Sequence, residues 1–161
     1  MAGIYPNITT FEIDTLASET AASKSTQHPD YSRLAARICI SANHKSTPSS
    51  FAEAISILNE DGRGFVSNEI ADLVQRRSQE IEERMDMSRD FDMSYFGFKT
   101  LERSYLLKLD QDTIIERPQY MWMRVALGIH CCKSHEDDND NNDGDADREE
   151  ITTGVHQQRK G

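Results

Sequence analysis

Apolar residues recur every three or four positions through most of the first 130 residues, and this spacing is the strongest constraint on the fold. It places apolar side chains on one face of a helix, where they can pack against a core. The first such stripe comprises Ile13, Leu16, Ala17 and Ala21. Further helices are predicted from residue 29, over about 49–60, over about 67–85 and over 118–130. The chain is therefore expected to be mainly α-helical.

Local start and stop signals support these boundaries. Thr9 and Glu12 have the spacing of a capping box, and Pro29 stands where proline suits the first turn of a second helix. The turns "KSTPSS" (45–50) and "NEDGRG" (59–64) end the second and third helices.

The next three helices also have apolar stripes. The apolar positions are Tyr31, Leu34, Ala35, Ile38, Cys39 and Ala42 in the second helix, Phe51, Ala54, Ile55 and Leu58 in the third, and Ile70, Leu73, Val74 and Ile81 in the fourth.

The segment "YFGFKTLERSYLLK" (95–108) is unusually dense in aromatic and leucine side chains. Read as a helix over 95–107, it carries apolar groups around much of its circumference. A buried helix of a small bundle would account for this pattern, although the preceding helices offer little surface to cover it. The next stretch, "LLKLDQDTIIERP", has two short apolar runs around a turn-like "DQD" and predicts a weak β-hairpin near 107–116.

The charge of the chain is concentrated near its C-terminal end. The formal net charge is −10, and residues 131–161 hold nine acids and four bases, so this last fifth supplies half of it. The same residues contain no aromatic side chain and few apolar ones, too few to offset the entropy lost on ordering. Residues 131–161 are therefore predicted to be a disordered acidic tail. The acidic balance also argues against nucleic acid as a partner.

Neither export nor membrane insertion is indicated. The first residues, "MAGIYPNITT", lack the basic and apolar regions of a secretory signal, and no apolar run approaches the length of a membrane span. Three cysteines do not make a disulfide framework. A soluble, cytoplasmic protein is expected.

Three blocks carry a resemblance to a known family. They are "ITTFEIDTLASETAASKSTQHPDYSRLAARICISANHK", "DFDMSYFGFKTLERSYLLK" and "ERPQYMWMRVALGIH". In this order and spacing they resemble the large subunit of class I ribonucleotide reductase, from about Ile8 to His130. That family reduces ribonucleoside diphosphates to deoxyribonucleotides for DNA synthesis, with a radical supplied by a small subunit.

The resemblance implies a division of the chain into three parts. Residues 1–48 resemble the last helices of the ATP cone, a small regulatory domain that begins further upstream in the family. Residues 49–130 resemble the helical N-terminal region of the large subunit, and residues 131–161 are the tail. The catalytic α/β barrel of the family lies almost wholly beyond the position of His130. The resemblance therefore implies a truncated large subunit without the catalytic barrel.

The resemblance also implies an allosteric nucleotide site. Thr10, Asp14 and Lys45 match positions that contact ATP or dATP in the ATP cone. Thr10 and Asp14 are four residues apart on one helix, and an antiparallel second helix would return Lys45 to their level. Ordinary helix-end roles would also explain all three residues: capping for Thr10, and interaction with a helix dipole for Asp14 and Lys45. The part of the cone that grips the phosphates would precede Met1, so weak or lost binding is expected.

No catalytic residue and no metal ligand is assigned. Cys39, Cys131 and Cys132 match none of the family's redox cysteines, and adjacent cysteines are poorly placed for a disulfide. Two metal patterns are weak. In "HCCKSH" the possible zinc ligands His130, Cys131, Cys132 and His135 lack the usual spaced pairs. Residues 139–150 place Asn139, Asn141, Asp143, Gly144 and Glu150 as in a calcium loop, but begin with Asn and lack a good exiting helix.

Two functions are compatible with these features of the sequence. The first is a piece of a reductase large subunit, inactive by itself, whose partners would be the small subunit, other large subunits and the nucleotide effector. The alternative is a stand-alone helical module that docks on reductase subunits or tunes their nucleotide sensing. Neither reading calls for nucleic acid or a membrane.

Overall fold

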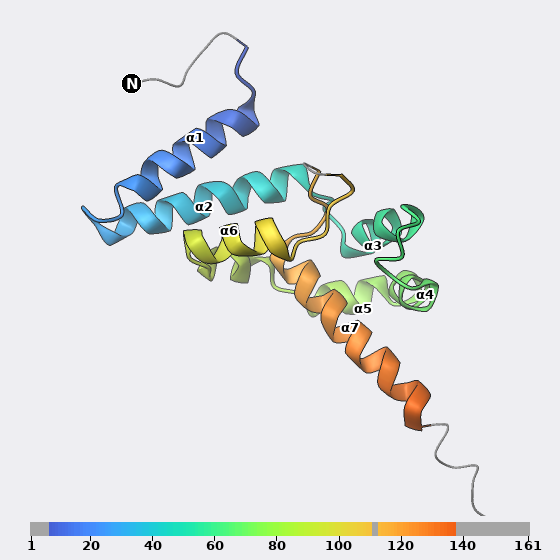
Figure 1. The fold of residues 1–161 in the computed structure, drawn as a ribbon. Helices are drawn as coiled ribbons and strands as arrows, with labels where there is room; N and C mark the ends of the chain where they lie inside the picture. Colours follow the sequence, from blue (N-terminus) through green and yellow to red (C-terminus); the bar gives the residue numbers. More distant parts are fainter. Residues whose placement is uncertain (1–6, 111–112, 138–161) are drawn as a thin grey trace, which may run out of the picture.

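The structure is a computed structural model that describes residues 7–110 and 113–137, with side chains as far as His130. Helices dominate it, as predicted, and Figure 1 shows their arrangement. In chain order the elements are α1 (Thr10–Ser23), α2 (Pro29–Ser46), α3 (Phe51–Glu60), α4 (Asn68–Arg76), α5 (Ser78–Glu83), the 3-10 helix η1 (Met87–Asp92), α6 (Tyr95–Ser104) and α7 (Pro118–Asp137).

The helices begin where the capping signals predict. Thr9 Oγ1 accepts the Glu12 N–H at 3.2 Å, and Glu12 Oε2 accepts the Thr9 N–H at 2.8 Å, so the capping box of α1 is confirmed. Pro29 occupies the first turn of α2, after an N-cap at His28. After α3, the chain turns through Gly62 and Gly64, whose φ angles of 75° and 73° favour glycine.

The helix predicted over residues 67–85 is wrong in one respect, because it is broken at Arg77. The backbone there leaves the helical region, at φ −122° and ψ 26°, so that α4 ends at Arg76 and α5 begins at Ser78. This turn lets Glu82 of α5 accept the Ser50 hydroxyl at 2.6 Å and the Ala52 N–H at 3.5 Å, at the start of α3. The break thus depends on contacts with a segment about 30 residues away, which apolar spacing does not reveal.

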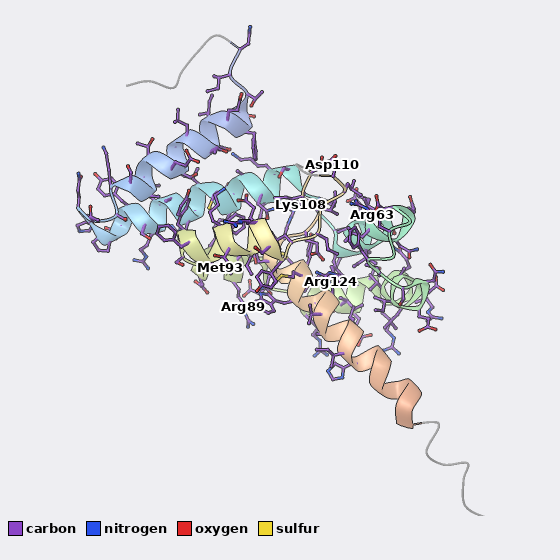
Figure 2. All side chains as sticks on the ribbon, viewed as in Figure 1. Arg63, Arg89, Met93, Lys108, Asp110 and Arg124 are labelled. Atoms are coloured by element: carbon purple, nitrogen blue, oxygen red, sulfur yellow. The ribbon has the colours of Figure 1, made fainter. Side chains whose placement is uncertain are left out.

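The hairpin predicted near 107–116 is reduced to one antiparallel bridge. Lys108 pairs with Ile114, and the Leu109 N–H donates to the Thr113 carbonyl at 2.9 Å. Within residues 7–110 and 113–137 no longer strand forms. The Arg63 guanidinium holds this turn from outside, donating to the Lys108 carbonyl at 2.9 Å and to the Leu109 carbonyl; Figure 2 shows Arg63 beside Lys108 and Asp110.

The last helix runs beyond the boundary predicted for it. α7 continues past His130 to Asp137, so residues 131–137 are helical rather than part of a disordered tail. Extending an existing helix adds one hydrogen bond for each residue that is ordered, and no proline or glycine interrupts residues 129–137. The C-terminal half of α7 projects away from the other helices (Figure 1). The remainder of the predicted tail, residues 138–161, lies outside the described residues.

The buried apolar side chains form two clusters. The first, here called the α3–α5 core, joins α3, α4 and α5 with Ile115 and Tyr120. The second, the α1–α2–α6 core, joins those three helices with Leu106 and Met121. α6 therefore packs on α2, and the second cluster includes residues from both sides of the boundary expected at residue 48.

Buried polar groups connect the two cores. Glu116 is fully buried, and its Oε1 lies 2.5 Å from Arg124 Nε, while its Oε2 accepts the Leu107 N–H at 2.9 Å. The Glu116 carbonyl accepts Asn43 Nδ2 at 3.3 Å. Arg117 donates to Thr47 Oγ1 at 2.9 Å. The end of α2 is thereby fixed to the start of α7.

A second buried carboxylate also links the end of α2 to the start of α7. Asp90 is fully buried; its Oδ2 lies 2.7 Å from His44 Nε2, and its Oδ1 accepts the Gln119 N–H at 3.1 Å. Buried carboxylates are tolerated where hydrogen bonds replace the water around them, and the carboxylates of Asp90 and Glu116 both meet that condition.

In the described part of the chain, no helix combines the length and apolar character needed to cross a bilayer.

Candidate functional site

The structure brings together two of the three residues that the resemblance assigns to a nucleotide effector. α1 and α2 form an antiparallel hairpin, so the start of α1 and the end of α2 lie at the same end of the pair (Figure 1). There Lys45 Nζ lies 3.2 Å from Asp14 Oδ2. Thr10 is the first residue of α1, one turn before Asp14 on the same side of the helix, and it is exposed. The N-cap of α1 is Thr9, so capping does not account for Thr10.

The Asp14–Lys45 ion pair is open to solvent. The Lys45 side chain is 69% exposed and that of Asp14 is 26% exposed. Exposed pairs of this kind contribute little to stability, so the pair can open when a ligand competes for either partner. A phosphate could take the Lys45 ammonium, while the Asp14 carboxylate could accept a hydroxyl or amino group. Lys45 is the single cation among the three residues, which limits the attraction for a triphosphate.

Cys39 is the one cysteine whose side chain the structure describes, and it is not placed for redox chemistry. It is buried in α2, and its Sγ donates to the Ala36 carbonyl at 3.2 Å. Burial raises the pKa of the thiol to about 11, so the reactive thiolate is scarce at neutral pH. The side chains of Cys131 and Cys132 lie outside the described residues.

The two weak metal patterns are not tested by the structure. The zinc pattern at 130–135 and the calcium-loop pattern at 139–150 fall largely or wholly outside the described side chains. Among the side chains that are described, no group of three or more histidine, cysteine or acidic residues is arranged to hold a metal ion.

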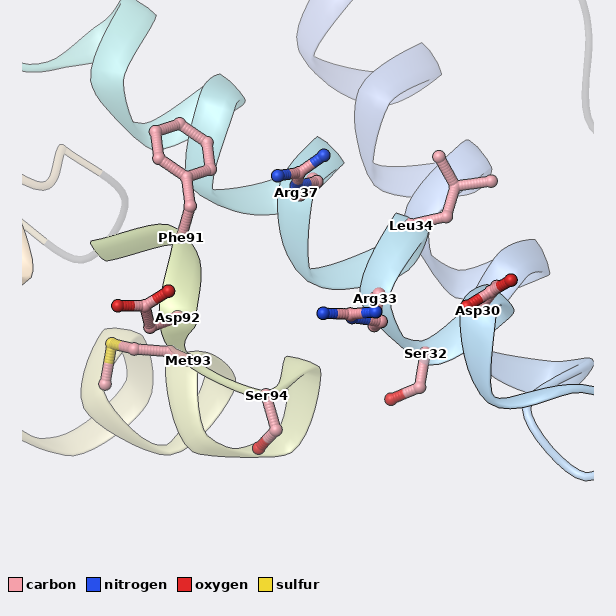
Figure 3. A pocket seen from close by; sticks show the side chains of 9 residues that line it. All are labelled: Asp30, Ser32, Arg33, Leu34, Arg37, Phe91, Asp92, Met93 and Ser94. Carbon is pink, nitrogen blue, oxygen red and sulfur yellow. The ribbon is translucent and has the colours of Figure 1, made fainter. Parts of the chain in front are cut away.

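A cavity of about 640 Å³ lies between α2 and the segment that joins η1 to α6. Figure 3 shows Arg33 and Arg37 on the α2 wall, with Asp92 and Ser94 on the other wall. Two guanidinium groups suit an anion. Asp30 and Asp92 line the same cavity, however, and their carboxylates offset the positive charge. This balance favours no particular class of ligand.

Sequence reasoning missed the polar residues that fix the end of α2. Asn43 is 5% exposed, and it follows Cys39 by four residues on the apolar face of the helix. A polar residue at an apolar position of a helix indicates either a buried hydrogen bond or a site, so a signal was present. Asp90 and Glu116 gave no such signal, because isolated acids in polar turns are usually exposed.

The chain is similar to known proteins over most of its length. The family model described as "Ribonucleotide reductase, all-alpha domain" matches residues 91–152. The chain is 45% identical to the ribonucleoside-diphosphate reductase large chain of Schizosaccharomyces pombe over 137 residues, which cover 81% of this chain. It is 48% identical to the large subunit of Arabidopsis thaliana over 136 residues, and 47% identical to that of Vaccinia virus over 135, each covering 80% of this chain. The chain is homologous to the N-terminal region of the ribonucleotide reductase large subunit.

The extent of this similarity differs from one comparison to the other. The chain spans only 17% of the S. pombe reductase chain and 16% of the A. thaliana one. The reductase family model also extends to residue 152, beyond His130, where we expected the resemblance to end. The all-α description of the matched reductase domain agrees with the helical fold.

Proposed function

We propose that this chain supplies the nucleotide-sensing helices of a ribonucleoside-diphosphate reductase large subunit, and that ATP or dATP binds at the open end of the α1–α2 hairpin. The observation that carries the proposal is the exposed contact between Asp14 and Lys45, 3.2 Å apart, one helical turn from Thr10. In this arrangement Lys45 meets a phosphate, and Asp14 and Thr10 accept or donate hydrogen bonds to the sugar or base.

Binding to the isolated chain is expected to be weak. A triphosphate usually requires several donors, whereas Lys45 is the one cation of the proposed site. The net charge of −10 also repels the ligand. We expect a dissociation constant above about 1 mM, equivalent to at most about 4 kcal/mol of binding free energy.

A titration of the 161-residue chain with ATP, followed residue by residue by NMR, tests this proposal. Shifts should concentrate at Thr10, Asp14 and Lys45, and Lys45→Ala should abolish them. Lys24→Ala is the matched control, because Lys24 is an exposed lysine at the opposite end of α1. Micromolar binding that both Asp14→Ala and Lys45→Ala abolish would support the site but contradict the expected weakness. Binding that neither substitution changes would refute the site.

Catalysis is not expected from this chain alone. Ribonucleotide reduction in the family needs redox cysteines, and none of Cys39, Cys131 and Cys132 matches their motifs. With a nucleoside diphosphate, a reductant and a competent small subunit, the purified chain should form no deoxynucleotide. Turnover above background would refute this expectation. The small subunit and other large subunits remain the partners that we propose for this chain.

One observation favours the alternative, a helical module that docks on reductase subunits. Trp122, Val125 and Ile129 lie on one face of α7 and are 53%, 42% and 53% exposed. An apolar stripe of this kind is typical of a surface that contacts another protein. Capture of a purified full-length reductase large subunit by this chain, lost in Trp122→Ala but retained in Lys24→Ala, would support docking.

A further inference from the structure

α7 carries apolar side chains on two opposite sides. On its inner side, Met123 and Leu127 pack against the α3–α5 core. On its outer side, Trp122, Val125 and Ile129 are 53%, 42% and 53% exposed. A helix that is apolar all round is normally buried all round. The outer side of α7 is therefore a surface that the described part of the chain leaves uncovered.

The exposed residues of α7 form one narrow stripe. Trp122, Val125, Ala126 and Ile129 lie within about 100° of the helix circumference and about 10 Å of its length. Ala126 is exposed like the other three, and none of the four residues is charged. Gly128 borders the stripe, with open space where a side chain would begin. The stripe thus has a large residue at each end, and the small residues beside it leave room for a facing side chain.

This stripe is complementary to itself. Its midpoint lies between Val125 and Ala126, so a second copy of α7 running in the opposite direction would set its own Ile129 against Trp122. The two Val125 side chains would then lie side by side at the two-fold axis. A contact of this kind uses the same surface on both copies. Because the stripe is uncharged, it brings no like charges together, although each chain has a net charge of −10.

The charge of the chain also favours the antiparallel arrangement. A parallel pair would set two acidic folds side by side, whereas an antiparallel pair keeps them at opposite ends of the paired helices, where they repel each other less. The C-terminal half of α7 projects away from the other helices, which leaves space for a second helix along it (Figure 1).

The area of the stripe sets the strength of the pairing. From their exposures, Trp122, Val125 and Ile129 offer roughly 300 Å² per copy, or roughly 600 Å² for the pair. Stable interfaces bury at least about 1,200 Å² in total. A dimer formed by this stripe is therefore weak and requires a high concentration of the chain.

We propose that two copies of this chain associate weakly and antiparallel through the outer side of α7, with Trp122 packed against Ile129 of the second copy. The pairing does not depend on the nucleotide site at Asp14 and Lys45, which lies on the α1–α2 hairpin. It competes with docking on a reductase subunit, because both contacts would use Trp122.

Sedimentation equilibrium of the 161-residue chain tests the association. The mean mass should be that of a monomer at about 10 μM and should rise toward that of a dimer at about 1 mM. Raising the salt from about 0.05 M to about 0.5 M should strengthen the association, because it screens the repulsion between the acidic chains. A chain that stays monomeric at about 1 mM at both salt concentrations would overturn the proposal. If that monomer still captured a reductase large subunit through Trp122, the stripe would belong to docking instead.

Charge reversal at the two-fold axis separates this pairing from general aggregation. Val125→Glu and Val125→Lys should each weaken association at least about tenfold, because like charges then meet. An equimolar mixture of the two variants should associate again, which misfolded variants would not do. Phe96→Glu is the matched control and should have no such effect, since Phe96 is 69% exposed on α6, outside the stripe. A mixture that stays monomeric, or an equal effect of Phe96→Glu, would refute the contact at Val125.

Disulfide formation determines the direction of the two helices. In a background of Cys131→Ser and Cys132→Ser, chains with Trp122→Cys mixed with chains with Ile129→Cys should form linked dimers. Trp122→Cys chains alone should link at least about tenfold more slowly, because antiparallel helices hold these two positions too far apart for a disulfide. Faster linking of Trp122→Cys alone would contradict the antiparallel arrangement.

Discussion

The two cores of this molecule differ in the size of the side chains that their helices bury. The α3–α5 core buries large side chains, including Phe51, Leu58 and Tyr120 at 1%, 0% and 1% exposure. In the α1–α2–α6 core, the hairpin contributes mostly alanines, such as Ala21 and Ala35. Small residues allow α1 and α2 to approach closely, but they bury little apolar surface. In the first core, large side chains come from α3, whereas in the second the α1–α2 hairpin supplies mainly small side chains and α6 supplies the large Tyr95 and Phe98.

α1 illustrates the consequence of this difference. Its larger apolar residues, Phe11 and Ile13, are 58% and 44% exposed, while Ser18 and Ala21 are its buried residues. Hydrophobic stabilisation grows with the apolar area removed from water, so α1 gains less from packing than α3 does. Elements with few buried apolar contacts open first, and we expect α1 to exchange its amide protons before α3.

The largest expected difference in stability lies between a variant that lacks a phenylalanine of α3 and one that lacks a phenylalanine of α1. Phe51→Ala should lower the free energy of unfolding by about 4 kcal/mol, because it leaves a cavity in a tightly packed core. Phe11→Ala should change it by less than about 0.5 kcal/mol, since its ring is largely in solvent. Urea unfolding followed by circular dichroism measures both. Similar losses in the two variants would show that Phe11 of α1 is packed as tightly as Phe51 of α3, against the exposures described above.

A smaller effect is expected at the polar junction between the cores. Arg124→Ala leaves the buried Glu116 carboxylate without its guanidinium partner and should cost about 3 kcal/mol at neutral pH. Arg124→Ala combined with Glu116→Gln should recover part of this loss, because the unpaired charge is then gone. Thermal unfolding at pH 7 makes the comparison, with Arg103→Ala, at an exposed position of α6, as the control. No recovery in the double variant would indicate that the charge itself is not the cause.

The smallest effect concerns pH and the α1–α2–α6 core. Burial raises the pKa of Cys39 from 9.0 to about 11, so between these values the unfolded chain has lost the thiol proton and the folded chain retains it. Stability should therefore fall as the pH rises from about 9 to about 11. In a background of Cys131→Ser and Cys132→Ser, thiolate absorbance should rise near pH 11 when folded and near pH 9 in urea. A folded midpoint near 9 would contradict the burial of this thiol.

Much of the local structure could be predicted from the sequence, because its causes are local. The Thr9–Glu12 capping box, Pro29 and the Gly62–Gly64 turn act on backbone groups within a few residues. The extension of α7 to Asp137 was missed, because the prediction used the loss of apolar residues after His130 as a helix end. Helix propagation needs only continued hydrogen bonding and the absence of a breaker.

The candidate site was predictable in part. The sequence places Asp14 and Lys45 on two helices joined by a short turn, and their contact at 3.2 Å follows from an antiparallel hairpin. The burial of Asn43 and the lack of a hydrogen-bond partner for its Oδ1 among the described residues were not predictable. They depend on the Glu116 carbonyl, which accepts the Asn43 amide from 73 residues further along the chain.

By itself, the sequence determined the helical character of this protein, most of its helix starts and its relation to the reductase large subunit. These depend on residue spacing, capping chemistry and similarity along the chain. Only the tertiary structure decided that α4 and α5 separate at Arg77, that α6 packs with α2, and that Asp90 and Glu116 are buried. Each of these depends on contacts between segments that are far apart in the sequence. The contribution of such contacts to the free energy of folding cannot be inferred from a local sequence pattern.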